Sequence, residues 1–185
     1  MVSIGSQLSS IRRSVPTDAL NTLVHAFVAS RIDYCNAVLY GVTNAVIWRL
    51  QAVLHAAARL ITGVRRNDHI TPTLRDTLHW LPVSQRIIFK IALMTYDSIR
   101  GRSPAYFRDV CVPVASVAFC SLLRSADRGV MIVPRTQTTR YGPRSFRVAA
   151  PQIWNSLPSH LKNINKSLEQ FKSGLKSWLF VQAYS

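Results

Sequence analysis

Apolar side chains recur at spacings of three and four residues through the first hundred positions of this chain, which is the periodicity of helices with one buried face. The first such segment begins near Pro16 and Thr17 and continues to Gly41. Its expected buried face consists of Leu20, Leu23, Val24, Phe27 and Val28. Gly41 supplies the expected stop, because a glycine readily takes the left-handed conformation that ends a helix.

Two further segments follow the same rule. One starts with Thr43 or Asn44 as a cap and ends at Gly63; the other lies before Gly101. The stripe expected in the first comprises Val46, Ile47, Leu50, Val53, Leu54, Ala57 and Ile61. The stripe expected in the second comprises Ile87, Ile91, Met94 and Ile99. The chain therefore begins with a helical block, residues 1–101.

The pattern changes after residue 101. The runs "GVMIVPR" and "RSFRVAAPQIW" are rich in β-type residues, but proline interrupts both, which favours edge strands or extended arms. A last helix is expected from Ser167, where Gln170 completes a capping box. We therefore predict a mainly α fold: a helical bundle, a short β or irregular basic segment over 102–160, and a C-terminal helix within 161–185.

Composition limits the function classes. Hydrophobic residues make up 48% and charged residues 17% of the chain, which excludes an intrinsically disordered composition. Lysine and arginine number 23 against 8 acidic residues, for a net charge of +15, which indicates a polyanionic partner. Three cysteines do not form a disulfide framework, so we expect an intracellular protein of the cytoplasm or nucleus. The apolar runs are too short and too interrupted to predict a membrane span.

Residues for catalysis or metal binding are not arranged as such sites require. The acidic residues are scattered, whereas two-metal phosphoryl chemistry needs clustered carboxylates. Zinc spacings, phosphate-binding glycine loops and the GxSxG elbow are also missing from the sequence. Cys35 and His25 lie ten positions apart, too far for a nucleophile pair on one helix. We predict no catalytic residue, no metal site, no cofactor and no small-molecule substrate.

Basic side chains with aromatic residues between them are the strongest candidate site. Such a pattern is typical of surfaces that hold nucleic-acid strands, although a solvated positive face with core aromatics would look the same. The candidate nucleic-acid-binding residues are Arg59, Arg65, Arg66, Arg86, Lys90, Arg124, Arg128, Arg135, Arg140, Arg144 and Arg147. The aromatics among the later ones are Tyr141, Phe146 and Trp154.

Several stretches in order also resemble a known family. They are "LVHAFVASRIDYCNAVLYG", "LQAVLHAAARLITG", "DHITPTLRDTLHWLPVSQRIIFK", "LRSADRGVMIVPRT" and "YGPRSFRVAAPQIWNSLPSHLK". Together they are similar to the C-terminal region of LINE-type (non-long-terminal-repeat) retrotransposon reverse transcriptases, such as those of jockey-like mobile elements. The resemblance implies that the helical block corresponds to the thumb and the region after it, which hold template RNA and the growing hybrid.

The family's polymerase motif, Ala-Asp-Asp after an apolar or aromatic residue, does not occur in this sequence. The resemblance then implies a reverse-transcriptase fragment, derived from an RNA-directed DNA polymerase, without the active site; fingers and palm would lie upstream. RNA or an RNA–DNA hybrid is the expected partner. Three alternatives remain: a polymerase subunit that acts with a separately encoded palm, a domesticated protein-interaction module, and a chain without a function of its own whose helices expose apolar faces and aggregate. Within "LHWLPVSQRIIFK", Trp80, Leu81 and Pro82 are expected to pack a turn, with Arg86 and Lys90 presenting charge.

Overall fold

A computed structural model describes residues 15–107, 109–117, 129–139, 141–163 and 165–185. The fold is mainly α, as predicted, and the described ranges contain no strand; one isolated antiparallel bridge pairs Pro113 with Met131. The chain divides into two compact units. The first comprises the described residues of Met1–Asn36, Val42–Arg86 and Tyr184, and the second those of Ala37–Gly41, Ile87–Ala183 and Ser185. The boundary expected at residue 101 lies inside the second unit.

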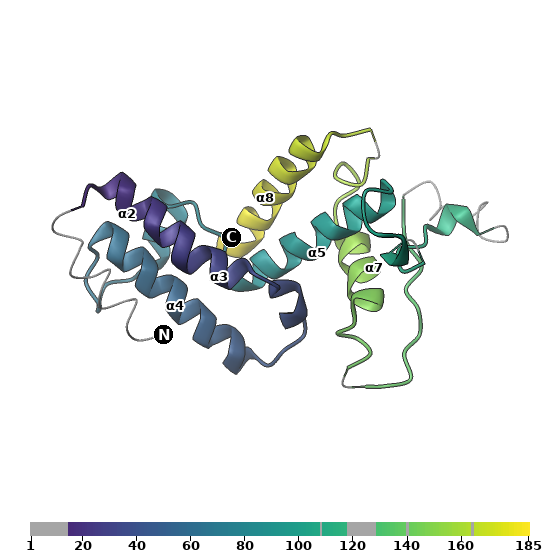
Figure 1. Cartoon of the computed structure of the whole chain (residues 1–185), viewed down its shortest axis with the longest axis horizontal. Helices are drawn as coiled ribbons and strands as arrows, with labels where there is room; N and C mark the ends of the chain where they lie inside the picture. The colour runs from purple at the N-terminus through teal and green to yellow at the C-terminus, as the bar shows by residue number, and fades with distance from the viewer. Residues whose placement is uncertain (1–14, 108, 118–128, 140, 164) are drawn as a thin grey trace. The chain divides into compact units, whose positions relative to one another are not determined.

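Helix α4 (Asn44–Thr62) is the longest element of the first unit. It starts after Thr43 and ends at Gly63, whose φ of 77° and N–H bond to the Arg59 carbonyl at 2.8 Å form a left-handed cap. Both ends match the prediction. The helix α2 (Thr17–Val24), the π-helical turn His25–Ala29 and α3 (Ser30–Asp33) precede it, and α2 and the π turn pack against α4 (Figure 1).

The predicted buried face of the first helix is wrong beyond Val24. Leu20 and Val24 are buried, but the next buried residues are Ala29 and Ile32, while Phe27 is 52% exposed. The π turn closes with a hydrogen bond between residues five apart, from the Ser30 N–H to the His25 carbonyl, and so inserts one residue and shifts the helical register between Val24 and Ala29. The apolar face therefore continues through residues that an uninterrupted α-helix would have pointed elsewhere.

The end predicted for that helix is also wrong. It ends at Asp33, followed by extended Tyr34 and by Cys35 with a φ of 53°, and only a short 3-10 turn, Asn36–Leu39, precedes Gly41. The Asp33 carboxylate accepts a hydrogen bond from Arg86 at 2.8 Å. This contact comes from a residue 53 positions away, so local sequence could not reveal it.

Trp80 and Leu81 are buried, as the sequence predicted, in the segment between the π-helical turn Thr73–Thr77 and helix α5 (Val83–Ile99). The indole of Trp80 meets the imidazole of His25 edge-on, with ring centroids 5.4 Å apart. His79 has a φ of 49°, so it occupies the tight turn before this segment. Trp80, Leu81 and His25 therefore contribute to the packing of the first unit.

The second unit is built on α5, α7 (Phe146–Ser156) and α8 (Leu168–Tyr184), which Figure 1 shows. The predicted capping box is confirmed: Ser167 accepts from the Gln170 amide at 3.3 Å and donates its own N–H to Gln170 at 3.0 Å. Tyr96 of α5 stacks on Phe171 of α8 with centroids 4.4 Å apart. That pair lies at the centre of this unit's apolar core.

The strand or extended arm expected in "RSFRVAAPQIW" is in fact helix α7, with Pro151 inside it. Proline removes one backbone donor, here the partner of the Arg147 carbonyl, at a cost of roughly 3 kcal/mol. Burial of the apolar face, including Ile153 and Trp154, offsets that loss. The run "GVMIVPR" does contain an extended arm: Met131 bonds Asn155 through both its N–H and its carbonyl, at 2.8 and 2.9 Å.

Candidate nucleic-acid interface

One side of helix α4 is exposed and carries an aromatic residue beside a cation. Trp48 is 69% exposed, and Arg49, Ala52 and Ala56 on the same helix are also exposed. Helix α4 contains no acidic residue along its whole length. This surface therefore combines a flat aromatic ring with positive charge. No carboxylate on α4 would repel a bound anion.

The turn after α4, residues 64–68, presents Arg65 and Arg66 to solvent. Arg59 holds this turn in place: its guanidinium donates to the carbonyl of Arg65 at 3.4 Å and to that of Asp68 at 3.3 Å. The Asp68 carboxylate in addition accepts from the Arg65 N–H at 3.3 Å. Among the described residues, neither the Arg65 nor the Arg66 side chain forms an ion pair. Arg59 is thus a positioning residue, and the two arginines of the turn are available to a ligand.

Helical geometry relates the turn to the exposed indole. Trp48 and Arg59 are eleven residues apart, which at ~100° per residue brings them to nearly the same side of α4. Arg59 bonds the 64–68 turn. The turn therefore lies at the C-terminal end of α4, on the same side of the helix as Trp48. The rise from Trp48 to the helix end is on the order of 20 Å.

Arg86 and Lys90, both sequence candidates, differ in their surroundings. The Arg86 side chain is 13% exposed and bonds Asp33 and, at 2.8 Å, the Leu81 carbonyl. Its guanidinium also lies 5.9 Å from the Trp80 ring centroid. Arg86 therefore links Asp33 to the start of α5 within the first unit. The prediction that it presents its charge to a ligand is wrong, because the side chain is mostly buried. Lys90 is exposed and belongs to the second unit.

The basic segment of the second unit is only partly described. Arg124, Arg128 and Arg140 lie outside the described residues. Arg135 and Arg147 are exposed. Arg144 is half-buried, donates to the Tyr40 carbonyl at 3.2 Å and lies 5.9 Å from the centroid of the Tyr141 ring. Of the described arginines of this segment, two remain available to a ligand.

The aromatic residues of that segment differ from the prediction. Trp154 is 3% exposed and donates its indole N–H to the Gly129 carbonyl at 2.9 Å. Phe146 packs edge-on against Phe107 at 4.9 Å. Of these three aromatic residues, Tyr141 is the exposed one, at 65%, and the Arg144 guanidinium lies over its ring. Trp48 was not among the residues predicted from the sequence. The helical periodicity places it on the side of α4 opposite the buried Leu54 and Ile61, which could have identified it as an exposed aromatic residue.

A polar chain of contacts ties α4 to the start of α5 within the first unit. The Val83 N–H donates to the Gln51 side-chain oxygen at 2.9 Å, and the Gln51 amide nitrogen lies 2.8 Å from His55 Nε2. Since the amide NH₂ can only donate, His55 accepts at Nε2 and must be neutral. Burial, and to a smaller extent the Arg59 charge, lowers the pKa of His55.

We expect this contact to make stability depend on pH. Because the folded-state pKa of His55 lies below its ordinary value of 6.5, the unfolded chain binds the proton first. The stability is full above that value and falls as the pH drops through it towards the folded pKa. Melting curves from pH 7.5 to 5 should show a steeper decline for the wild type than for His55→Gln. Identical slopes for the wild type and His55→Gln would contradict the assignment.

No group of three metal-ligating side chains occurs in the described ranges. Across the same ranges, no helix has the length and apolar character needed to cross a membrane.

Comparison of the chain with family models, with curated proteins and with solved structures gave no match.

Proposed function

We propose that this chain binds single-stranded RNA or an RNA–DNA hybrid through the α4 surface, defined as Trp48, Arg49, Arg65 and Arg66. The observation that carries the proposal is that Arg59 fixes the 64–68 turn on the side of α4 that exposes Trp48. A base stacks on the indole while phosphates of the same strand reach the guanidinium groups. The net charge of +15 supports the same class of partner.

The length of the surface sets the size of the ligand. Each nucleotide of a stacked strand advances about 3.4 Å along the strand axis, so roughly 20 Å of helix corresponds to about six nucleotides of a stacked strand. That falls in the range of site sizes, about 4–16 nucleotides, typical of surfaces that stack bases without reading their sequence. Binding is therefore expected to depend on strand length up to about six nucleotides and little on base identity.

The resemblance to the region after the palm of LINE-type reverse transcriptases supports this ligand class. In that reading the chain is a non-catalytic fragment of such an enzyme, and its role is to hold the template or the hybrid. We propose no polymerase step for its residues. The exposed aromatic and cationic groups of the first unit account for binding without one.

Replacing Trp48 tests the stacking contribution. Trp48→Ala should lower the affinity for a labelled six-nucleotide RNA at least about fivefold, since one stacked base contributes about 1–3 kcal/mol. Stability should change by less than about 0.5 kcal/mol, because the indole is mostly exposed. Fluorescence anisotropy gives the affinity, and chemical denaturation gives the stability.

Trp48→Phe, which keeps an aromatic ring, should retain most of the affinity. The same titrations with single-stranded RNA, single-stranded DNA and the hybrid rank the possible ligands. Equal affinity of wild type and Trp48→Ala for all three would refute the role of the indole. Absence of binding at low salt by a folded sample would refute the proposed function itself.

A further inference from the structure

A histidine lies on the same side of α4 as the exposed indole and the arginine that holds the 64–68 turn. His55 follows Trp48 by seven residues and precedes Arg59 by four. At ~100° per residue, the three side chains fall within about 40° of one another around the helix axis. The rise of ~1.5 Å per residue places His55 about 10 Å from Trp48 along that axis. The imidazole, which is half-buried, therefore lies between the two ends of the α4 surface.

A nucleic-acid strand that contacts both ends of the α4 surface has to pass this imidazole. Such a strand advances about 3.4 Å per nucleotide, so roughly the third nucleotide from Trp48 comes level with His55. Ala52 and Ala56 next to it are exposed and carry only methyl groups. Nothing bulky on these two positions holds the phosphates of the strand away from the helix.

In the free protein the imidazole is held neutral. The Gln51 amide donates to His55 Nε2 at 2.8 Å, and the Gln51 oxygen accepts from the Val83 N–H at 2.9 Å. A proton on Nε2 turns that acceptor into a donor, so the Gln51 amide has to rotate and the Val83 N–H loses its acceptor. Burial, and to a smaller extent the Arg59 charge, lowers the pKa of His55. Protonation therefore needs a negative charge close by to offset these costs.

The protein itself does not provide that negative charge. Within the part of the chain that the structure describes, no carboxylate pairs with His55. Helix α2, the two π turns and the start of α5 adjoin α4. The charged or titratable groups of these elements are Asp18, His25, Arg75, Asp76 and Arg86. Arg75 and Asp76 pair with each other, and Arg86 pairs with Asp33. A phosphate of a bound strand is thus the anion that suits this position.

We propose that His55 takes up a proton at Nε2 when a nucleic-acid strand occupies the α4 surface, and that its positive charge then attracts a phosphate of that strand. This inference rests on the proposed function. The proton comes from the solvent, and the strand binds the protonated form more tightly than the neutral one. By linkage, the affinity rises as the pH falls through the pKa of His55 in the complex, and it levels off below the lower pKa of the free protein. Acid therefore strengthens binding, although it weakens the free fold.

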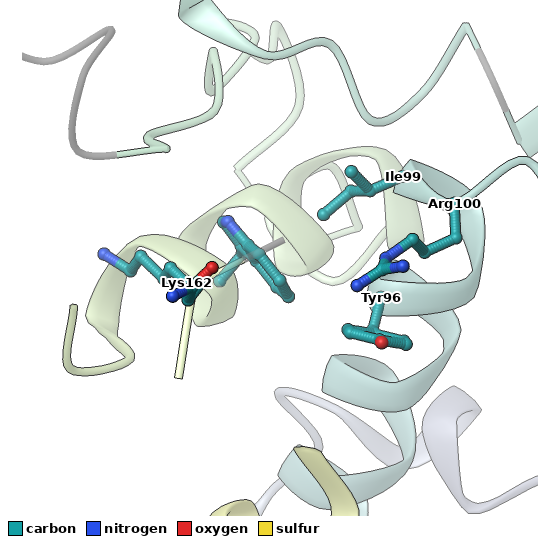
Figure 2. A pocket seen from close by; sticks show the side chains of 6 residues that line it. Tyr96, Ile99, Arg100 and Lys162 are labelled. Atoms are coloured by element: carbon teal, nitrogen blue, oxygen red, sulfur yellow. The ribbon is translucent and has the colours of Figure 1, made fainter. Parts of the chain in front are cut away.

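Cations beside the pocket of the second unit provide a contrast. Figure 2 shows that pocket, which is lined by Tyr96, Ile99, Arg100, Trp154, Lys162 and Asn163. Arg100 donates to the Lys166 carbonyl at 2.7 Å. Lys162 donates to the Asn155 carbonyl at 2.8 Å and extends away from Arg100 (Figure 2). Each of these two charges bonds a carbonyl of the protein, and they do not converge as the groups along α4 do.

The test compares the affinity for a six-nucleotide oligouridine, whose bases do not titrate in this range, at pH 7.5 and pH 5.5. On acidification, the affinity of the wild type should rise at least about threefold more than that of His55→Gln. His160→Gln removes an exposed imidazole of the second unit and is the matched control, so it should keep the response of the wild type. Fluorescence anisotropy gives the affinities, and circular dichroism confirms that each sample is folded at both pH values.

NMR titration of the histidine rings gives a second readout that requires no variant. Bound oligouridine should move the titration midpoint of His55 up by about 0.5 pH unit or more and that of His160 by about 0.2 or less. Equal acid responses of the wild type and His55→Gln, or a His55 midpoint that RNA leaves in place, would each overturn the inference while the proposed function stands. Absence of binding at both pH values at low salt would instead refute both.

Discussion

Replacing Arg65 and Arg66 together by glutamine should lower the affinity for single-stranded RNA on the order of 100-fold at 0.05 M salt and about tenfold at 0.2 M. Each phosphate contact contributes ~0.7–0.9 to the slope of log K against log salt, so the slope should decrease by about 1.5. Both side chains are exposed at the end of α4, so folding should be unaffected. Anisotropy titrations at several salt concentrations measure both quantities.

A charge-matched control separates a local contact from the general effect of net charge. Lys172→Gln with Lys176→Gln removes the same charge from α8, in the second unit. That pair should change the slope by less than about 0.5. Parallel losses in the two double variants would mean that binding is diffuse, and the α4 surface would then have no special role.

Truncating Phe171 should destabilise the second unit by about 3–5 kcal/mol. The ring is 0% exposed, stacks on Tyr96 at 4.4 Å and lies 5.9 Å from the Trp154 ring centroid. A typical domain is stable by only about 5–15 kcal/mol, so Phe171→Ala removes a large part of the total. Urea denaturation followed by circular dichroism gives the free energy of unfolding.

Val181 on the same helix is 64% exposed and provides the control. Val181→Ala should change the free energy of unfolding by less than about 0.5 kcal/mol. A loss below about 1 kcal/mol for Phe171→Ala would show that α8 does not pack through this ring.

Local signals predicted the elements whose ends depend on nearby residues. Thr43 and Gly63 bound α4, and Ser167 with Gln170 starts α8, because caps and left-handed glycines act within one turn. The first helix behaved differently. It contains a π turn and ends early at Asp33, whose carboxylate accepts a hydrogen bond from Arg86, a residue distant in sequence. Helix α7 was missed because a proline and β-branched residues outweighed the spacing of Val148, Ile153 and Trp154.

The candidate site was predictable only at the level of residue type. Sequence predicted that basic and aromatic residues bind nucleic acid, which stays a prediction. The structure shows that five of the basic candidates are exposed: Arg65, Arg66, Lys90, Arg135 and Arg147. Sequence could not tell that Arg59 and Arg86 contact backbone carbonyls or that Trp154 is buried, since these facts depend on tertiary contacts. The sequence alone does not distinguish an arginine whose guanidinium is exposed to solvent from one whose guanidinium bonds the protein's own carbonyls.

The hydrogen bonds from Arg59 to the 64–68 turn also have a consequence for the entropy of the proposed binding. Ordering a backbone residue costs about 1–2 kcal/mol, and in this turn that cost is met during folding. A ligand that reaches Arg65 and Arg66 then has to restrict side chains only, because the loop that carries them is already ordered. Pre-organisation of this kind leaves more of the contact energy as affinity. The arginine that seemed to be a ligand-binding residue thus acts one step earlier, by fixing the backbone from which the other two reach.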